Sequence, residues 1–171
     1  MKDKPTLDTN ILIYAFGKQD DKRKHIAKEI IAKCNIISLQ VVNETAYVLL
    51  RKFNFQEPEL NKVIEFMKQK FIITSLNIHI LDQTLKIAAR YGFSFWDSMM
   101  VASALDNHCS VLYTEDLQHE QLIEGHLQII NPFIISWLPG YSPSQAHEIN
   151  SLFHLPISGR MLWNRWGAKW S

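Results

Sequence analysis

The sequence has few of the features that mark several large classes of protein. Only two of its 171 residues are cysteines, and Cys34 and Cys109 form no CxxC pair, so the isolated thiols fit a reducing cytoplasm. No apolar run approaches the roughly 20 residues that a membrane span needs. The formal net charge is only +1, so no global basic field indicates a nucleic-acid partner. Any phosphate must therefore be handled by a local site.

Several catalytic motifs are also missing. The seven histidines show no HExxH spacing, and the chain has neither a glycine-rich phosphate loop nor a GxSxG elbow. Residues 1–5 lead directly into a predicted strand, so we expect no signal peptide. With 47% hydrophobic and 20% charged residues, the length predicts one cytoplasmic domain with a real core.

Residues 5–133 alternate short β-rich runs with amphipathic helical segments. Strands separated by helices predict a parallel sheet, here of four to five strands, with helices on both faces. In such sheets, binding sites lie beyond the carboxyl ends of the strands. We therefore look for chemistry at the residues that directly follow a strand.

Local signals predict where several helices begin and end. Thr9 or Asn10 can cap the helix that follows the first strand, and Ser94 can cap a later one. A helix over residues 78–91 is expected to stop at Gly92. Its spacing predicts a set of inward-facing residues, namely Leu81, Leu85, Ala88 and Ala89.

Residues 134–171 have a different composition. They hold four of the five tryptophans and few charges. We interpret them as a Trp-rich C-terminal extension rather than an independent domain. Its mixture of cations and aromatic rings could stack on bases or lie at a membrane surface, but an extension without a fold of its own is the plainer interpretation.

The most informative feature is a set of four acids at structured junctions: Asp8, Glu44, Asp97 and Asp116. Asp8 and Asp116 follow predicted strands, whereas Glu44 and Asp97 lie in predicted helices. Acids among apolar neighbours cost free energy unless something compensates them. If the fold gathers all four, the simplest compensation is a divalent metal, and oxygen ligands favour Mg²⁺ or Mn²⁺.

Each acid also has an ordinary structural interpretation. Asp97 stands three residues after Ser94 and could complete a capping box. Asp8 could merely cap a helix, and Asp116 could serve the turn after a strand. Glu44 is the hardest to dismiss, because it shares a helix face with apolar residues.

The set as a whole resembles a known family. The matching motifs are Leu7-Asp8-Thr9-Asn10, Asn43-Glu44, Phe95-Trp96-Asp97-Ser98 and Tyr113-Thr114-Glu115-Asp116-Leu117. Their order, spacing and setting resemble the four motifs of PIN-domain nucleases, and most closely the VapC-type toxins of bacterial toxin–antitoxin pairs. The resemblance implies that residues 1–133 form a PIN-like α/β domain, a three-layer α/β/α sandwich, with metal-dependent endoribonuclease activity.

The resemblance also implies roles for individual residues. Asp8, Glu44, Asp97 and Asp116 would be the catalytic residues and would bind Mg²⁺ or Mn²⁺, and Glu44 would act directly or through water. Asn10 and Thr114 would support these acids from behind. The implied partners are an RNA substrate, a VapB-type antitoxin and a second copy of the chain, without a membrane.

Two other functions stay open at this point. One is a phosphatase of the haloacid-dehalogenase type with Asp8 as covalent nucleophile, which would want a second aspartate where Asn10 stands. The other is a non-catalytic PIN fold that binds RNA or a protein partner. Loss of an acid would indicate the second function, and none of the four is lost.

Overall fold

The computed structural model describes residues 4–17 and 23–134, so every expectation for residues 135–171 lies outside the described residues. Within them, no helix combines the length and apolarity that crossing a bilayer requires. The elements follow the order β1 (Pro5–Leu7), α1 (Thr9–Phe16), α2 (Arg23–Lys33), β2 (Ile36–Ser38), α3 (Leu39–Phe53), α4 (Glu57–Lys70), β3 (Ile72–Thr74), α5 (Ile78–Tyr91), α6 (Phe95–Asp106), β4 (Val111–Tyr113), β5 (Leu122–Ile123) and β6 (Leu127–Ile130).

The predicted parallel sheet is confirmed, and its strands fall into two groups. The larger group has the order β1-β4-β6-β5, and β2 pairs with β3. All pairings are parallel except that between β5 and β6. The Thr6 hydroxyl of β1 donates to the Ile36 carbonyl of β2 over 3.0 Å, which joins the two groups. The antiparallel β5 was not expected, because two residues are too few to show a period.

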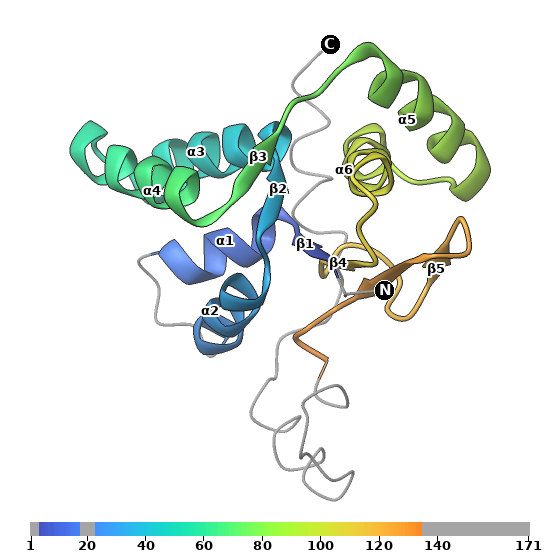
Figure 1. Cartoon of the computed structure of the whole chain (residues 1–171). Helices are drawn as coiled ribbons and strands as arrows, with labels where there is room; N and C mark the ends of the chain where they lie inside the picture. Colours follow the sequence, from blue (N-terminus) through green and yellow to red (C-terminus); the bar gives the residue numbers. More distant parts are fainter. Residues whose placement is uncertain (1–3, 18–22, 135–171) are drawn as a thin grey trace, which may run out of the picture.

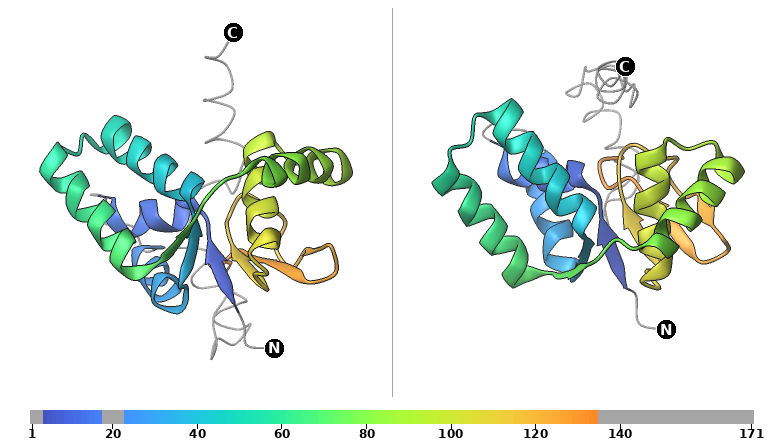
Figure 2. Two further views of the ribbon diagram at one scale, coloured as in Figure 1. Left: turned by 45° about the horizontal axis from the view of Figure 1, so that its top comes forward. Right: turned by 90° about the horizontal axis from the view of Figure 1, so that it is seen from above.

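Helices cover both sides of the strands. Figures 1 and 2 show α1 to α4 on one side and α5 with α6 on the other. Successive residues of β4 serve opposite cores, since Leu112 packs into the core beneath α6 and Tyr113 into the core beneath α1 and α3. This alternation follows from the two-residue period of a strand. The predicted helix-flanked fold is therefore confirmed.

The helix ends agree with the sequence at two of three positions. Ser94 caps α6, and Gly92 ends α5 with a φ of 71°, a conformation that glycine adopts without steric cost. Thr9 or Asn10 as the cap of α1 was wrong, because Asp8 is the N-cap, as the structural interpretation of Asp8 allowed. The helix thus begins at once after β1.

The inward face predicted for α5 was also wrong. The structure buries Ile80, Thr84 and Ile87, whereas Leu81 is 36% and Leu85 57% exposed. Thr84 can be buried because its hydroxyl donates to the Ile80 carbonyl over 2.8 Å. Hydrophobic periodicity does not register that a threonine can be buried when its hydroxyl bonds within its own helix.

Candidate active site

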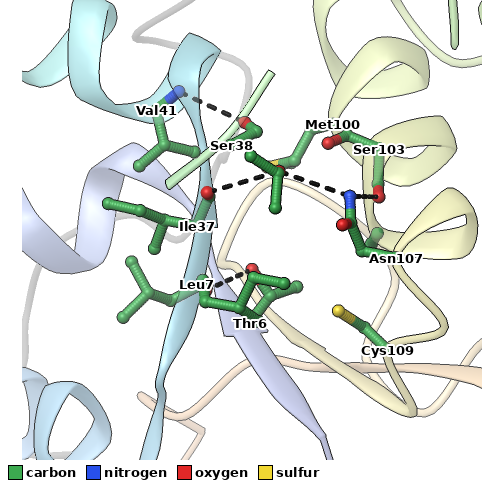
Figure 3. A pocket seen from close by; sticks show the side chains of 12 residues that line it. Thr6, Leu7, Ile37, Ser38, Val41, Met100, Ser103, Asn107 and Cys109 are labelled. Atoms are coloured by element: carbon green, nitrogen blue, oxygen red, sulfur yellow. Dashed lines mark hydrogen bonds between the residues drawn. The ribbon is translucent and has the colours of Figure 1, made fainter. Parts of the chain in front are cut away.

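The pocket in Figure 3 is not the candidate site. It lies between β1, β2 and α6, and its lining includes Thr6, Ser38, Ser103 and Asn107. None of the four acids lines it. Its cavity of about 10 Å³ has room for roughly one water molecule. It cannot admit a substrate, so the acids have to be considered on their own.

Asp8 and Thr114 meet because β1 and β4 are parallel neighbours. Leu7, the last residue of β1, lies opposite Tyr113, the last residue of β4. The next residue of each strand is therefore Asp8 on one and Thr114 on the other, side by side. Asp8 is 7% exposed, and the Thr114 hydroxyl donates to its Oδ2 over 2.7 Å. The backbone N–H of Thr9 donates to its other oxygen. Both Asp8 oxygens are therefore held in place.

Asn10 connects Asp8 with Asp116. Its Nδ2 donates to Asp8 Oδ2 over 3.0 Å and to Asp116 Oδ2 over 3.2 Å. The Thr114 hydroxyl also accepts a hydrogen bond from the backbone N–H of Asp116 over 3.2 Å. Two carboxylates that the sequence separates widely are thus brought together by Asn10 and Thr114.

Glu44 reaches the same region from α3. Thr9 donates to its Oε2 over 3.3 Å, and Gln40 donates to its Oε1 over 2.9 Å. The same Gln40 nitrogen donates to the Trp96 carbonyl of α6 over 3.1 Å, so Gln40 links Glu44 to the helix that carries Asp97. Gln40 was not expected at the site, although it lies four residues before Glu44, a spacing at which helical side chains pair.

Asp97 is held by its own helix start. The Ser94 hydroxyl donates to Asp97 Oδ2 over 2.6 Å and accepts from the Asp97 backbone N–H over 3.1 Å. Ser94 is therefore the N-cap of α6, but Asp97 bonds to its hydroxyl rather than to its backbone N–H, so the capping box is not completed. Burial raises the pKa values of Asp8, Glu44 and Asp116, and the negative charge of Asp97 adds a smaller increase to each. The residue that the cap Ser94 holds is thus also one of the four candidate acids.

Burial is the largest cause of a raised pKa at each of the four acids. Burial, followed by the charge of Asp116, raises the pKa of Asp8 well above its ordinary value. Burial, followed by the charge of Glu115, raises the pKa of Asp116 to about 6. Burial likewise raises the pKa values of Glu44 and Asp97. Such mutual repulsion favours protons or cations at the site.

The donor set suits a hard divalent cation. All four acids offer oxygen, and Asn10 Oδ1 is a buried oxygen without a hydrogen-bond partner among the described residues. In residues 4–17 and 23–134, no three histidine, cysteine or acidic side chains already form a metal cage. Mg²⁺ does not need one, because it usually keeps several waters and binds through one or two carboxylates with substrate phosphate. The residues present fit a site of that open kind.

A further cluster borders Asp116. The Tyr14 hydroxyl donates to Glu115, and Arg23 pairs with Glu115 over 3.4 Å. The Arg23 guanidinium lies 3.9 Å from the centre of the Tyr14 ring. This cluster ties α1 and α2 to the segment after β4. It places a positive charge on Glu115, the sequence neighbour of Asp116, and was not expected from the sequence.

With the fold and the acids described, the chain can be assigned to a family. Residues 6–124 match the PIN domain, and the protein belongs to the PIN-domain family. The resemblance of its four motifs is thereby confirmed. No curated protein matches the sequence.

Solved structures share the fold at low identity. A toxin–antitoxin complex from Klebsiella pneumoniae is 20% identical with a TM-score of 0.57, and the match covers 76% of this chain and 98% of that one. A DNA-bound VapBC from Salmonella typhimurium is also 20% identical, with a TM-score of 0.55 and coverages of 74% and 98%. A sarcin-ricin loop cleaving VapC toxin of Mycobacterium tuberculosis is 16% identical, with a TM-score of 0.53 and coverages of 64% and 87%.

Proposed function

We propose that the protein is a metal-dependent endoribonuclease and the toxin of a type II toxin–antitoxin pair. The observation that carries the proposal is the joining of Asp8 and Asp116 by Asn10. Burial raises the pKa values of both aspartates, and the charges of Glu44 and Asp97 add to that effect. Membership of the PIN-domain family supports the nuclease class. The toxin complexes that share the fold support the toxin role.

The four acids would hold Mg²⁺ or Mn²⁺ through their carboxylate oxygens. A metal bound there lowers the pKa of a bound water and neutralises charge on the phosphodiester. Asn10 and Thr114 keep Asp8 and Asp116 at one place, so that these ligands need little rearrangement. RNA would enter as substrate, although the net charge of the chain does not attract it.

We assign to Glu44 the role of orienting the attacking water and accepting its proton. Thr9 and Gln40 fix one carboxylate oxygen each, which orients the remaining lone pairs. In the proposed reaction, the water oxygen bonds to phosphorus and its proton passes to Glu44. The bond from phosphorus to the 3′-oxygen breaks, and the leaving oxygen takes a proton from solvent water. The products are therefore a 5′-phosphate and a 3′-hydroxyl.

The geometry argues against a phosphatase that uses Asp8 as a nucleophile. Asp8 accepts hydrogen bonds at both oxygens and is almost fully buried. Asn10 donates to Asp8 through its amide and cannot supply or remove a proton as an aspartate would. A non-catalytic PIN protein is the remaining alternative, and the cleavage experiment separates it from the nuclease.

The proposed partners are a VapB-type antitoxin and a second copy of the chain. The antitoxin would cover the acids, with an Arg among the carboxylates, because bidentate Arg–carboxylate pairs suit a concentrated anionic site. The homodimer is supported by the exposed apolar residues of α5, where Ile78 is 73% and Leu85 57% exposed. We place the protein in the cytoplasm, consistent with two free, buried cysteines.

Total RNA incubated with the purified chain tests the proposed activity. We expect cleavage in Mg²⁺ or Mn²⁺ and none in EDTA, with 5′-phosphate ends on the products. Equal cleavage with and without the chelator would refute the metal mechanism. Binding of RNA without cleavage in either metal would favour the non-catalytic alternative.

A further inference from the structure

Two exposed aromatic side chains stand at the start of α6, directly before Asp97. Phe95 is 41% and Trp96 45% exposed. Their ring centroids are 5.4 Å apart at an interplanar angle of 83°, an edge-to-face arrangement that stabilises both rings. Large apolar side chains kept in solvent beside a candidate site indicate a binding surface.

The backbone beneath the Trp96 ring is tied to the acids. Gln40 donates from one nitrogen to the Trp96 carbonyl over 3.1 Å and to Glu44 over 2.9 Å. One residue later, the Asp97 N–H is held by the cap Ser94. The start of α6 therefore cannot shift without disturbing Glu44 or Asp97, so the Trp96 ring extends from an anchored position.

We propose that Trp96, braced by Phe95, is a stacking surface for a base of single-stranded RNA next to the phosphodiester that is cut. The inference rests on the proposed function, because Trp96 directly precedes Asp97 at the start of α6, within reach of a base that adjoins a phosphodiester held by Asp97. Stacking on an aromatic ring adds affinity for any base. It is also uncharged, so it adds affinity without interacting with the negative charge of the acids.

The main competitor for this surface is an apolar side chain of a protein partner. Ring chemistry distinguishes the two occupants, because a base needs a flat π surface whereas an apolar side chain needs only apolar area. Phenylalanine at position 96 keeps a flat ring, and leucine at that position keeps apolar area without one. The two substitutions therefore separate stacking on RNA from docking of a protein.

The experiment measures binding of a short, fluorescein-labelled single-stranded RNA of mixed sequence to the intact chain by anisotropy. Ca²⁺ replaces Mg²⁺ so that binding can be followed apart from cleavage. We expect Trp96→Ala and Trp96→Leu to raise the Kd roughly 5- to 100-fold, whereas Trp96→Phe stays within about threefold of the parent. The matched control is Leu122→Ala on β5, which removes a side chain that is 55% exposed and should not change the Kd.

The salt dependence gives a second measurement. Loss of stacking removes no phosphate contact, so the slope of log Kd against log salt should be the same for the parent and Trp96→Ala. Thermal melts of each variant check that the fold is kept. Three results would each overturn the inference. Trp96→Leu could bind RNA as tightly as Trp96→Phe, all three Trp96 variants could bind like the parent, or the parent could fail to bind the RNA.

Failure of this inference can be told apart from failure of the proposed function. A parent chain that binds RNA through Trp96 but never cleaves it in Mg²⁺ or Mn²⁺ would refute the nuclease and leave the stacking surface intact. A parent that cleaves RNA with the same KM as its Trp96→Ala and Trp96→Leu variants would refute the stacking surface alone.

Discussion

The Thr114 hydroxyl donates to Oδ2 of Asp8 over 2.7 Å, although the two residues are 106 positions apart in the sequence. The contact follows from one pairing, since the parallel register of β1 and β4 sets Leu7 opposite Tyr113. Asp8 and Asp116 are then joined through Asn10. The candidate site is thus a consequence of strand order as much as of residue type.

Removal of the Thr114 hydroxyl tests its support of Asp8. Thr114→Val keeps the shape but leaves Asp8 without its shortest side-chain donor, so the pKa of Asp8 should rise further and metal affinity should fall, by about tenfold for a supporting contact. Calorimetric titration with Mn²⁺ measures this. Thr84→Val is the matched control, because Thr84 is equally buried and its hydroxyl bonds only within α5. Equal losses in both variants would contradict a specific role for Thr114.

Substitution of the acids tests the proposed ligands. Asp8→Asn and Asp97→Asn should abolish RNA cleavage while leaving the protein folded, because an amide cannot supply the charge that the metal needs. Single-turnover cleavage in Mn²⁺ measures the first effect and circular dichroism the second. The exposed Asp82 on α5 provides the control substitution Asp82→Asn. Nearly full activity in Asp97→Asn would show that Asp97 is not a metal ligand and only supports the start of α6 beside the cap Ser94.

The sequence predicted the elements of this fold better than their faces. Asp8 and Asp116 could be predicted to lie at one edge of the sheet, because both follow parallel strands, but the strand order that makes them neighbours came from the structure. The buried face of α5 could not be predicted, since it depends on Thr84 satisfying its hydroxyl within the helix. Periodicity counts apolar residues and does not register such a bond.

The same limit applies to the residues that surround the acids. Gln40 bonds to Glu44 within α3, which its spacing could have indicated, but its bond to the Trp96 carbonyl depends on how α3 meets α6. Arg23 pairs with Glu115, which lies 92 positions further along the sequence. Contacts between side chains of different helices or strands can be identified only once the packed structure is known. The roles of the four acids as metal ligands stay predictions.

Neutralising one acid should stabilise the metal-free protein. Two carboxylates about 4 Å apart repel by roughly 4 kcal/mol at an effective dielectric near 20, before proton uptake and water reduce it. We therefore expect Asp97→Asn or Asp116→Asn to raise the free energy of unfolding in EDTA by about 1 kcal/mol despite the loss of function. Mg²⁺ or Mn²⁺ should stabilise the parent more than either variant. Thermal melts in EDTA and in metal measure both effects.

Lower melting temperatures of both variants in EDTA would show that the acids have structural partners instead of one another. Asp97→Asn carries a particular risk, because it also alters the contact with the cap Ser94. Asp116→Asn has no such cap, so the pair distinguishes lost repulsion from a lost cap. Equal increases in melting temperature for the two variants would indicate that both lose repulsion between carboxylates.

The pH dependence of stability gives the last test. The pKa of Asp116 is raised from 3.8 to about 6 in the folded protein, so the folded state binds a proton more tightly than the unfolded state. Its contribution to stability is complete below pH 4 and is lost as the pH rises through about 6. Urea titrations of the metal-free chain between pH 4 and pH 7 should show the unfolding free energy falling with pH, and Asp116→Asn should flatten the part of that fall that lies between about pH 4 and pH 6. The other three acids also have raised pKa values, so a residual slope of the same sign remains. A parent whose stability rises over this range would show that the acids are not held together in a poorly hydrated site.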